Sequence, residues 1–202
     1  MVAYAIMSML EPDYRWLEGD VLQIAPRILG WELESQAGGA TTAGRIVEVE
    51  AYHGTNDPAS HAYAGRTPRT MPMFDIGGTV YVYLSYGIHA CMNIVTGPAG
   101  EASALLIRAL EPTQGVNIMA QRRHTTALAK LTTGPGNLSQ ALGITVALSD
   151  TRLGTVLSLR PPTTPTPSLS IAIGPRIGIS RATDYPWRFS LKHNPFVSPP
   201  RM

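Results

Sequence analysis

Residues 44–112 gather side chains of the types that enzymes use on aromatic ligands. This stretch carries a carboxylate, two tyrosines, a histidine, an asparagine and an arginine on or beside segments predicted to be neighbouring strands, and one further tyrosine at a hairpin tip. Aromatic faces stack on a planar heterocycle, and an ionised carboxylate can direct water at a bond beside it. The mixture therefore predicts a pocket that holds an aromatic heterocycle and attacks an adjacent bond.

Two glutamates lie on one face of the first of these strands. The period-two alternation of a strand places Glu48, Glu50 and Tyr52 on one side of segment 44–52. The same alternation puts Ile46 on that side. A carboxylate beside an apolar, aromatic surface has its pKa raised and can act as a general base toward water. The alternative is a pair of solvent-exposed glutamates on an edge strand, and this segment alone favours that alternative.

A tight turn at Tyr86-Gly87 joins two predicted strands, residues 79–86 and 89–95. This puts Tyr86 at an exposed apex, where an aromatic wedge between base pairs is one use of such a ring. The alternative is that Tyr86 folds back onto the core. Tyr83 and Asn93 lie on the strands that lead away from the turn, where they could line one pocket or serve in ordinary sheet packing.

A loop histidine and a strand arginine extend this set. His61 lies in a loop of small and polar residues, just before a short basic stretch that contains Arg66 and Arg69 and suits phosphate contacts. A loop histidine of this kind is usually solvated. Arg108 interrupts an apolar strand, so its charge needs a partner. The candidate carboxylates are Glu50, Glu48, Glu101 and Glu111.

The sequence lacks the residue patterns that several other kinds of site require. The five histidines show no metal-ligand spacing, so we expect no metal site, and no cofactor motif is present. The single cysteine, Cys91, cannot form an internal disulfide, and its apolar and neutral neighbours favour a packed residue over a nucleophile. A phosphate-cradling glycine loop and a nucleophilic serine elbow are also missing.

The charge is distributed unevenly along the chain. Residues 1–111 carry 6 arginines against 12 acidic residues, whereas residues 112–202 carry 10 basic residues against only Asp150 and Asp184. Arginines outnumber lysines 14 to 2, which favours planar contacts with phosphates. The basic half indicates either an anionic partner or a solvated basic face.

Length and composition indicate one loop-rich globular domain. The chain has 202 residues, of which 44% are hydrophobic, with 19 glycines and 17 prolines. No apolar run approaches the roughly 20 residues of a membrane span, and the apolar start has no basic leader and is interrupted early. We therefore expect an intracellular protein, cytoplasmic and nucleoid-associated if the source is bacterial.

Short segments rich in β-branched and aromatic residues predict an α+β fold, a single domain around a curved, mostly antiparallel β-sheet with a few helices. The predicted strands are residues 28–34, 45–52, 79–86, 89–95, 104–111 and 155–159. Pro112 is expected to open a helix over 113–123, and Pro135 a helix over 136–142 that Gly143 ends. The proline and threonine run at 161–167 predicts an exposed loop.

Together these motifs resemble the alkyladenine (3-methyladenine) DNA glycosylase family. The resemblance runs from about Leu29 to the C-terminus. Its motifs are residues 44–52, the His61 loop, 73–74, 78–93, 108–112, 134–135, 138–144, 176–178, 186–189 and 195–198. It implies a monomeric, monofunctional enzyme that excises alkylated or deaminated purines from double-stranded DNA without metal or organic cofactor.

The resemblance also implies catalytic roles. Glu50 matches the family's general base, which deprotonates the water that attacks the sugar C1′, and Arg108 helps to hold that water and the carboxylate. The transition state resembles the oxocarbenium ion of glycoside hydrolysis, which a nearby negative charge stabilises. The only lysines, Lys130 and Lys192, lie outside the motif region, which argues against lyase chemistry through a Schiff base.

Further matches concern the base and the duplex. Tyr52, His61 and Tyr83 match residues that stack on or hydrogen-bond the extruded base. Asn93 matches the residue that excludes guanine by crowding its exocyclic amino group, and Tyr86 matches the side chain that fills the gap in the duplex. The candidates for DNA backbone contacts are Arg66, Arg69, Arg122, Arg123, Arg176 and Arg181.

Three features depart from the family's pattern. Asn137 stands where many members carry a lysine, Ile88 follows the hairpin tip where a larger residue is common, and the 161–167 run does not align. Two other functions compete: a non-catalytic DNA-binding protein and a hydrolase of free nucleosides. Glu50, Arg108 and Asn93 argue against the first, and the uneven charge with the exposed tyrosine argues against the second.

Overall fold

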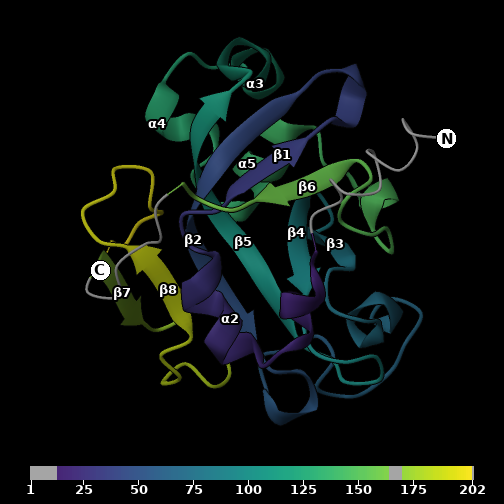
Figure 1. Ribbon diagram of the computed structural model, residues 1–202. Coiled ribbons are helices and arrows are strands. Elements are labelled where there is room, and N and C mark those ends of the chain that lie inside the picture. Colours follow the sequence, from purple (N-terminus) through teal and green to yellow (C-terminus); the bar gives the residue numbers. More distant parts are fainter. Residues whose placement is uncertain (1–12, 164–169, 202) are drawn as a thin grey trace, which may run out of the picture.

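An antiparallel sheet is the centre of the computed structural model, which describes residues 13–163 and 170–201 (Figure 1). Within those residues the sheet has eight strands in the order β3-β4-β5-β2-β1-β6, with β8 paired to β2 and β7 to β8. The strands are β1 (Glu32–Ser35), β2 (Thr42–Tyr52), β3 (Val80–Ser85), β4 (His89–Val95), β5 (Ala104–Gln114), β6 (Leu157–Arg160), β7 (Ile171–Gly174) and β8 (Arg188–Leu191). The predicted α+β single-domain fold with a mostly antiparallel sheet is confirmed.

Four α-helices and several short 3-10 turns complete the described part of the chain. The helices are α2 (Val21–Ile28), α3 (Val116–Arg123), α4 (Leu128–Leu131) and α5 (Pro135–Leu142). The 3-10 turns are η1 (Arg15–Glu18), η2 (Ala37–Gly39), η3 (Gly54–Asn56), η4 (Met71–Phe74) and η5 (Val146–Leu148). Among the described residues, no helix is long and apolar enough to cross a membrane.

The strand β2 lies in the middle of the sheet. It pairs with β5 along one edge, and along its other edge with β1 at residues 42–45 and with β8 at residues 48–50. Figure 1 shows β2 and β5 as long neighbouring ribbons through the centre of the molecule. Glu48 and Glu50 are both completely buried there. The alternative of exposed glutamates on an edge strand is therefore wrong.

The main apolar core lies between one face of the sheet and the helices α2 and α5. Figure 1 shows α2 crossing in front of β2 and β5, and α5 packs against β4 and β5. Alternate strand residues point into this core, which leaves the intervening side chains for the opposite face of the sheet. The core includes Ile24, Ile28, Ile46, Val49, Met92, Ile94, Leu105, Ile107, Leu138 and Leu142.

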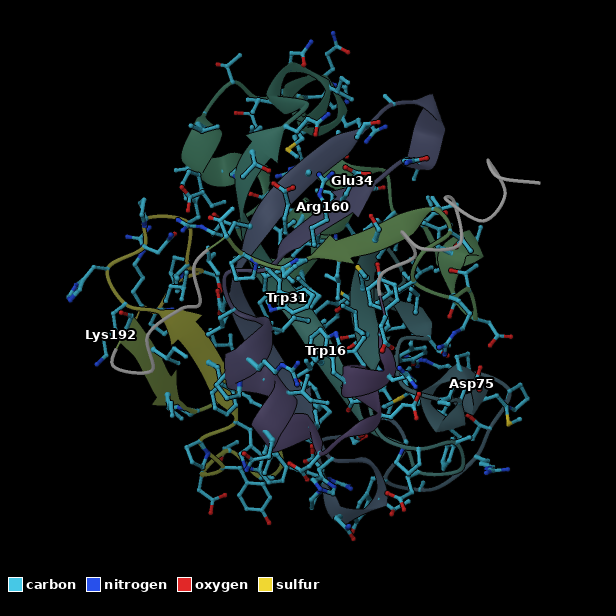
Figure 2. All side chains as sticks on the ribbon, in the orientation of Figure 1. Trp16, Trp31, Glu34, Asp75, Arg160 and Lys192 are labelled. Carbon is cyan, nitrogen blue, oxygen red and sulfur yellow. The ribbon has the colours of Figure 1, made fainter. Side chains whose placement is uncertain are left out.

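An aromatic pair and an ion-pair cluster close the outer edges of the core. Trp16 and Trp31 pack with ring centroids 4.5 Å apart, in front of the sheet (Figure 2). On the last strand of the path, Arg160 pairs with Glu32 at 2.7 Å and with Glu34 at 2.6 Å, which ties β6 to β1.

The ladder between β2 and β5 is irregular at the point where the polar residues begin. Ile46 pairs with Leu110, Glu48 with Ala109, and Val49 with the residue at 107, so Val47 and Arg108 have no directly opposed partner in this register. Bulges of this kind change the direction of side chains and are common beside active sites. The prediction that Ile46 shares a face with Glu48 is wrong, because Ile46 packs into the main core with Val49.

The N-terminal part of the described chain differs from the prediction. Residues 28–34 are not one strand: α2 ends at Ile28, and β1 begins only at Glu32. The Asp20 side chain caps this helix by accepting from the backbone N–H groups of Leu22 (2.8 Å) and Gln23 (3.2 Å). Pro26 within the helix masked its pattern in the sequence.

Pro112 does not open a helix. Strand β5 continues to Gln114, because its last residues pair with β2, with Pro112 opposite Gly44. Helix α3 begins after Gly115, which has a φ of 71° and lies where a Cβ would approach the Thr41 carbonyl oxygen to 2.5 Å. The predictions for β3, β4, the start of β5 and α5 agree with the structure within a residue.

The proline and threonine run at 161–167 is only partly described. Residues 161–163 follow β6 without regular secondary structure, and residues 164–167 lie outside the described residues.

Candidate active site

A cavity of about 700 Å³ opens beside the polar face of the sheet. Its wall comes from β2, β3, β4 and β5, from the loop before His61, from the β3-β4 turn and from residues 177–181. It brings together Tyr52, His61, Tyr83, Tyr86, Asn93 and Arg108. Residues predicted separately from five segments of the sequence thus line one space.

Glu50 lies directly behind the cavity wall. It forms hydrogen bonds and an ion pair with residues of that wall. Its carboxylate accepts hydrogen bonds from the Tyr52 hydroxyl (2.9 Å) and from the Ile177 backbone N–H (2.7 Å). Arg108 Nη1 lies 3.2 Å from Glu50 Oε1. Burial raises the pKa of Glu50, and Arg108, the Ile177 amide and the Tyr52 hydroxyl oppose that rise. The result is a carboxylate more basic than usual, whose ionised form is favoured by three donors.

Arg108 bridges the two buried glutamates. Its Nε lies 2.9 Å from Glu48 Oε1, and only 6% of the residue is exposed. Burial disfavours the charge, but the two carboxylates outweigh it and raise the pKa of Arg108. Of the partners considered from the sequence, Glu50 and Glu48 are both used, whereas Glu111 pairs with Arg45.

Three rings form one wall of the cavity. His61 meets Tyr83 edge-on, with centroids 4.5 Å apart and planes at 81°, and Tyr81 stacks on Tyr83 at 5.8 Å. The Tyr81 hydroxyl lies 3.1 Å from His61 Nδ1. Burial and the charge of Arg69 lower the pKa of His61, so the ring is neutral at neutral pH. Tyr81 was missed, although the alternation of β3 places it on the same face as Tyr83.

Tyr86 projects from the molecule at the tip of the β3-β4 hairpin. It is 93% exposed, and Leu84 and Ile88 beside it are 44% and 73% exposed. Tyr86 and Gly87 have φ values of 51° and 75°, the successive positive angles that two-residue hairpin turns favour. The alternative in which Tyr86 folds back onto the core is therefore wrong.

Asn93 is held in a fixed orientation at the cavity wall. Its Nδ2 donates to the backbone carbonyls of Tyr81 (3.1 Å) and Cys91 (3.2 Å). The residue is 4% exposed, and burial raises the pKa of the neighbouring Cys91 thiol. A neutral thiol agrees with the prediction that Cys91 is a packed residue.

Arg176 does not fit the prediction of a DNA backbone contact. Its guanidinium is buried and pairs with Asp57, with Nη1 2.5 Å from one carboxylate oxygen and Nη2 2.8 Å from the other. It also lies over the rings of Tyr52 (4.6 Å) and Trp187 (5.1 Å). This pair instead lies next to residue 177, whose backbone N–H donates to the Glu50 carboxylate.

The other candidate arginines divide into two groups. Arg122 donates to the carbonyls of Ala141 (3.1 Å) and Ala37 (2.8 Å), and Arg123 donates to the Leu131 carbonyl (3.2 Å). These internal contacts do not favour Arg122 and Arg123 as phosphate ligands. The exposed candidates are Arg66, Arg69 and Arg181.

Metal ligation finds no support in the part of the chain that the structure describes. No group of three or more histidine, cysteine, aspartate or glutamate side chains there could hold a metal ion. The two buried carboxylates behind the cavity wall, Glu48 and Glu50, both pair with the Arg108 guanidinium.

Comparison with known proteins identifies a family. The sequence pattern of methylpurine-DNA glycosylase (MPG) matches residues 15–195. The chain belongs to the methylpurine-DNA glycosylase family. The family pattern therefore covers all eight strands and all residues of the cavity.

Individual relatives carry names of the same family. The chain is 51% identical over 187 residues to a protein of Rhodopseudomonas palustris, covering 92% of this chain and 87% of the relative. A protein from another strain of that species is 47% identical over 183 residues (89% and 86%), and one of Methanoculleus marisnigri is 46% identical over 185 residues (90% and 95%). All three are provisionally named as 3-methyladenine DNA glycosylases.

Membership of the methylpurine-DNA glycosylase family confirms the resemblance predicted from the sequence. It identifies the chain as a DNA glycosylase of DNA repair, with DNA as its substrate. The roles of single residues, the range of damaged bases and the monomeric state stay predictions.

Proposed function

We propose that this DNA glycosylase rotates a damaged purine out of duplex DNA into the cavity and hydrolyses its N-glycosidic bond with water activated by Glu50. The observation that carries the proposal is the placement of an acid and a wedge at one cavity. Tyr86 and Gly87 line the same space as Tyr52 and Arg108, which contact Glu50 directly.

Extrusion precedes chemistry, because a stacked purine is inaccessible at its glycosidic bond. Rotating a nucleotide out of the duplex costs a few kcal/mol, less for a damaged or poorly paired base. Tyr86 offsets part of that cost by occupying the vacated stack. Its 93% exposure means that this ring is available without any rearrangement of the core.

The hydrolysis needs no group beyond the chain and water. Glu50 accepts a proton from water as the water oxygen bonds to C1′, and the bond between C1′ and the purine N9 breaks with its electron pair leaving on the base. The sugar acquires positive charge in the transition state, which the negative carboxylate stabilises. Arg108 holds the carboxylate from the side at 3.2 Å.

The cavity favours flat, electron-poor bases. Tyr52, His61 and Tyr83 offer faces and edges for an alkylated or deaminated purine, and a neutral His61 does not repel a cationic one. Asn93 crowds the exocyclic amino group of guanine and so disfavours that normal base. The cavity lining includes no lysine, in agreement with a monofunctional hydrolase.

The DNA-binding face surrounds the hairpin. Arg181 lines the cavity and is exposed, and Arg66 and Arg69 are exposed on the loop that follows His61. Their guanidinium groups contact phosphates on either side of the extruded nucleotide, and a monomer is sufficient because one chain supplies the acid, the pocket and the wedge.

The test is the release of free base. The protein is incubated with methylated duplex DNA, and with duplexes that hold a single hypoxanthine or ethenoadenine, and released base is measured by chromatography. Wild type releases base, whereas Glu50→Gln binds the same duplex and releases none. Binding without release by the wild type would favour a non-catalytic protein, and release only from free nucleosides would favour a nucleoside hydrolase. Full activity of Glu50→Gln would refute the assignment of the base.

A further inference from the structure

The C-terminal tail, residues 192–201, closes a buried ion network behind Glu50. Glu48 is completely buried and accepts from Arg108 Nε (2.9 Å) and Arg188 Nε (2.7 Å). Ser198 supplies two further donors, its backbone N–H and its hydroxyl, each 2.7 Å from Glu48. Donors from β5, from β8 and from the tail thus converge on one carboxylate.

Arg188 fastens the tail to the sheet. Its Nη2 donates to the backbone carbonyls of Ser198 and Pro200, each at 2.9 Å, and the residue is only 1% exposed. In the β2-β8 register Arg188 stands opposite Glu50. The tail therefore packs beside the catalytic strand, and its position depends on buried charges.

Arg108 is shared between two carboxylates that compete for it. Glu48 holds its Nε at 2.9 Å, Glu50 holds its Nη1 at 3.2 Å, and the Ser198 hydroxyl lies 3.4 Å from its Nη2. A buried carboxylate that loses one donor draws more strongly on those that remain. When Ser198 and Arg188 donate to Glu48, Glu48 draws less strongly on Arg108. The Arg108 guanidinium then interacts more strongly with Glu50.

We propose that Ser198 and Glu48 are positioning residues, through which the C-terminal tail sets how Arg108 divides its charge between Glu48 and Glu50. This inference rests on the proposed role of Glu50 as the base. The tail then controls the protonation of the reacting carboxylate although it does not line the cavity.

Other groups also face Glu50, and their contributions must be separated. They are Glu48 and Tyr52 on β2, Arg108 on β5, Arg188 on β8, Tyr83 on β3 and the Ile177 amide. Removing the Ser198 hydroxyl leaves all of these groups in place. It takes one donor from Glu48 and the 3.4 Å contact from Arg108 Nη2. A change in the titration of Glu50 would therefore report the Arg108 contact.

The sign of each shift follows from the charges. Loss of the Ser198 hydroxyl draws Arg108 toward Glu48 and away from Glu50, so the pKa of Glu50 rises. Replacement of Glu48 by glutamine removes a neighbouring negative charge and frees Arg108, so the pKa of Glu50 falls. Since the base must be ionised, the acid limb of the rate profile moves to higher pH in the first case and to lower pH in the second.

The experiment compares pH profiles of single-turnover base release for wild type, Ser198→Ala, Ser198→Thr and Glu48→Gln. The control is Ser35→Ala, which removes another buried serine hydroxyl, bonded to the Leu142 carbonyl at 2.8 Å. The second measurement is a ¹³C NMR titration of the side-chain carboxyls, in which Glu50→Gln identifies the Glu50 signal among eight glutamates. This titration does not depend on activity.

Ser198→Ala should move the Glu50 titration up by about half a pH unit, which lowers the rate on the acid limb about threefold and leaves the alkaline plateau within about twofold. Ser198→Thr should restore the wild-type profile, and Glu48→Gln should shift it by about one unit in the opposite direction. Ser35→Ala should lower the melting temperature without moving the titration.

Two outcomes would overturn the inference. One is a Ser198→Ala titration that superimposes on those of wild type and Ser35→Ala, and the other is a shift of the same sign for Ser198→Ala and Glu48→Gln. Glu48→Gln leaves two buried arginines with one carboxylate fewer, which destabilises the fold. If this variant does not fold, the comparison of Ser198→Ala with Ser35→Ala decides. Failure of the proposed function would appear separately, as wild-type protein that releases no base while the NMR shifts are still measured.

Discussion

The exposed hairpin tyrosine offers a sharp test, because its loss should affect catalysis but not the fold. Tyr86 is 93% exposed and makes no contribution to the core clusters of the described residues. We expect Tyr86→Ala to leave the melting temperature unchanged and to weaken extrusion of the damaged base. The effect should depend on how firmly that base is held in the duplex.

The size of the effect follows from stacking. An aromatic ring stacked on a nucleobase contributes about 1–3 kcal/mol, and 1.4 kcal/mol corresponds to a factor of ten. Loss of the ring should therefore reduce the extruded population, and with it the single-turnover rate, about 5- to 150-fold for a lesion in a good base pair. Where a mismatch already makes extrusion easy, the extruded state is well populated, so we expect a loss of only about threefold.

The assay is single-turnover base release from two duplexes that differ only in the base opposite the lesion. Tyr86→Phe is the matched control, since it keeps the ring and loses only the hydroxyl, and it should behave like wild type on both duplexes. Equal losses for Tyr86→Ala on the two duplexes, or a loss for Tyr86→Phe as large as for Tyr86→Ala, would refute the role of the ring as a wedge.

Three further predictions concern charge. The rate of wild type should fall as pH falls through the pKa of Glu50, because the base acts only when ionised. Since burial raises that pKa, the acid limb should lie above the ordinary carboxyl value of 4.5. The measurement is a pH-rate profile. Asp57→Asn should destabilise the protein by about 3–5 kcal/mol in denaturant unfolding, because it leaves the buried charge of Arg176 without a carboxylate partner. Arg181→Gln should weaken DNA binding uniformly across sequences and reduce the salt slope by about one, whereas Arg122→Gln, whose guanidinium is occupied by backbone carbonyls, should leave the slope unchanged.

Each of these has an outcome that would contradict it. An acid limb at or below the ordinary carboxyl pKa would mean that burial does not raise the pKa of Glu50. Stability of Asp57→Asn within about 1 kcal/mol of wild type would mean that the buried ion pair with Arg176 is dispensable. A salt slope that responds equally to Arg181 and Arg122 would mean that exposure does not identify the phosphate contacts.

The features predicted well from sequence are those set by local pattern. The turn at Tyr86-Gly87 and the strands on either side follow from alternation and from the need for positive φ angles, so the hairpin bounds agree within a residue. Alternation likewise put Glu50 and Tyr52 on one face, where the structure shows them bonded at 2.9 Å.

The features that sequence reasoning missed depend on contacts between distant residues. The register shift that separates Ile46 from Glu48 arises from pairing with β5, some 60 residues further along the chain. The Ile177 amide that contacts the Glu50 carboxylate has no side-chain signature, and Ser198 reaches Glu48 only through the folded tail. Arg176 was grouped with surface arginines because charge alone does not reveal a buried partner.

The most direct test of the account is a crystal structure of Glu50→Gln bound to a duplex with a single ethenoadenine. We expect the modified base inside the cavity against Tyr52, His61 and Tyr83. We expect the Tyr86 ring in the vacated stack, and C1′ on the side of the cavity where residue 50 lies. A base that remains stacked in the duplex, or one bound away from this cavity, would contradict it.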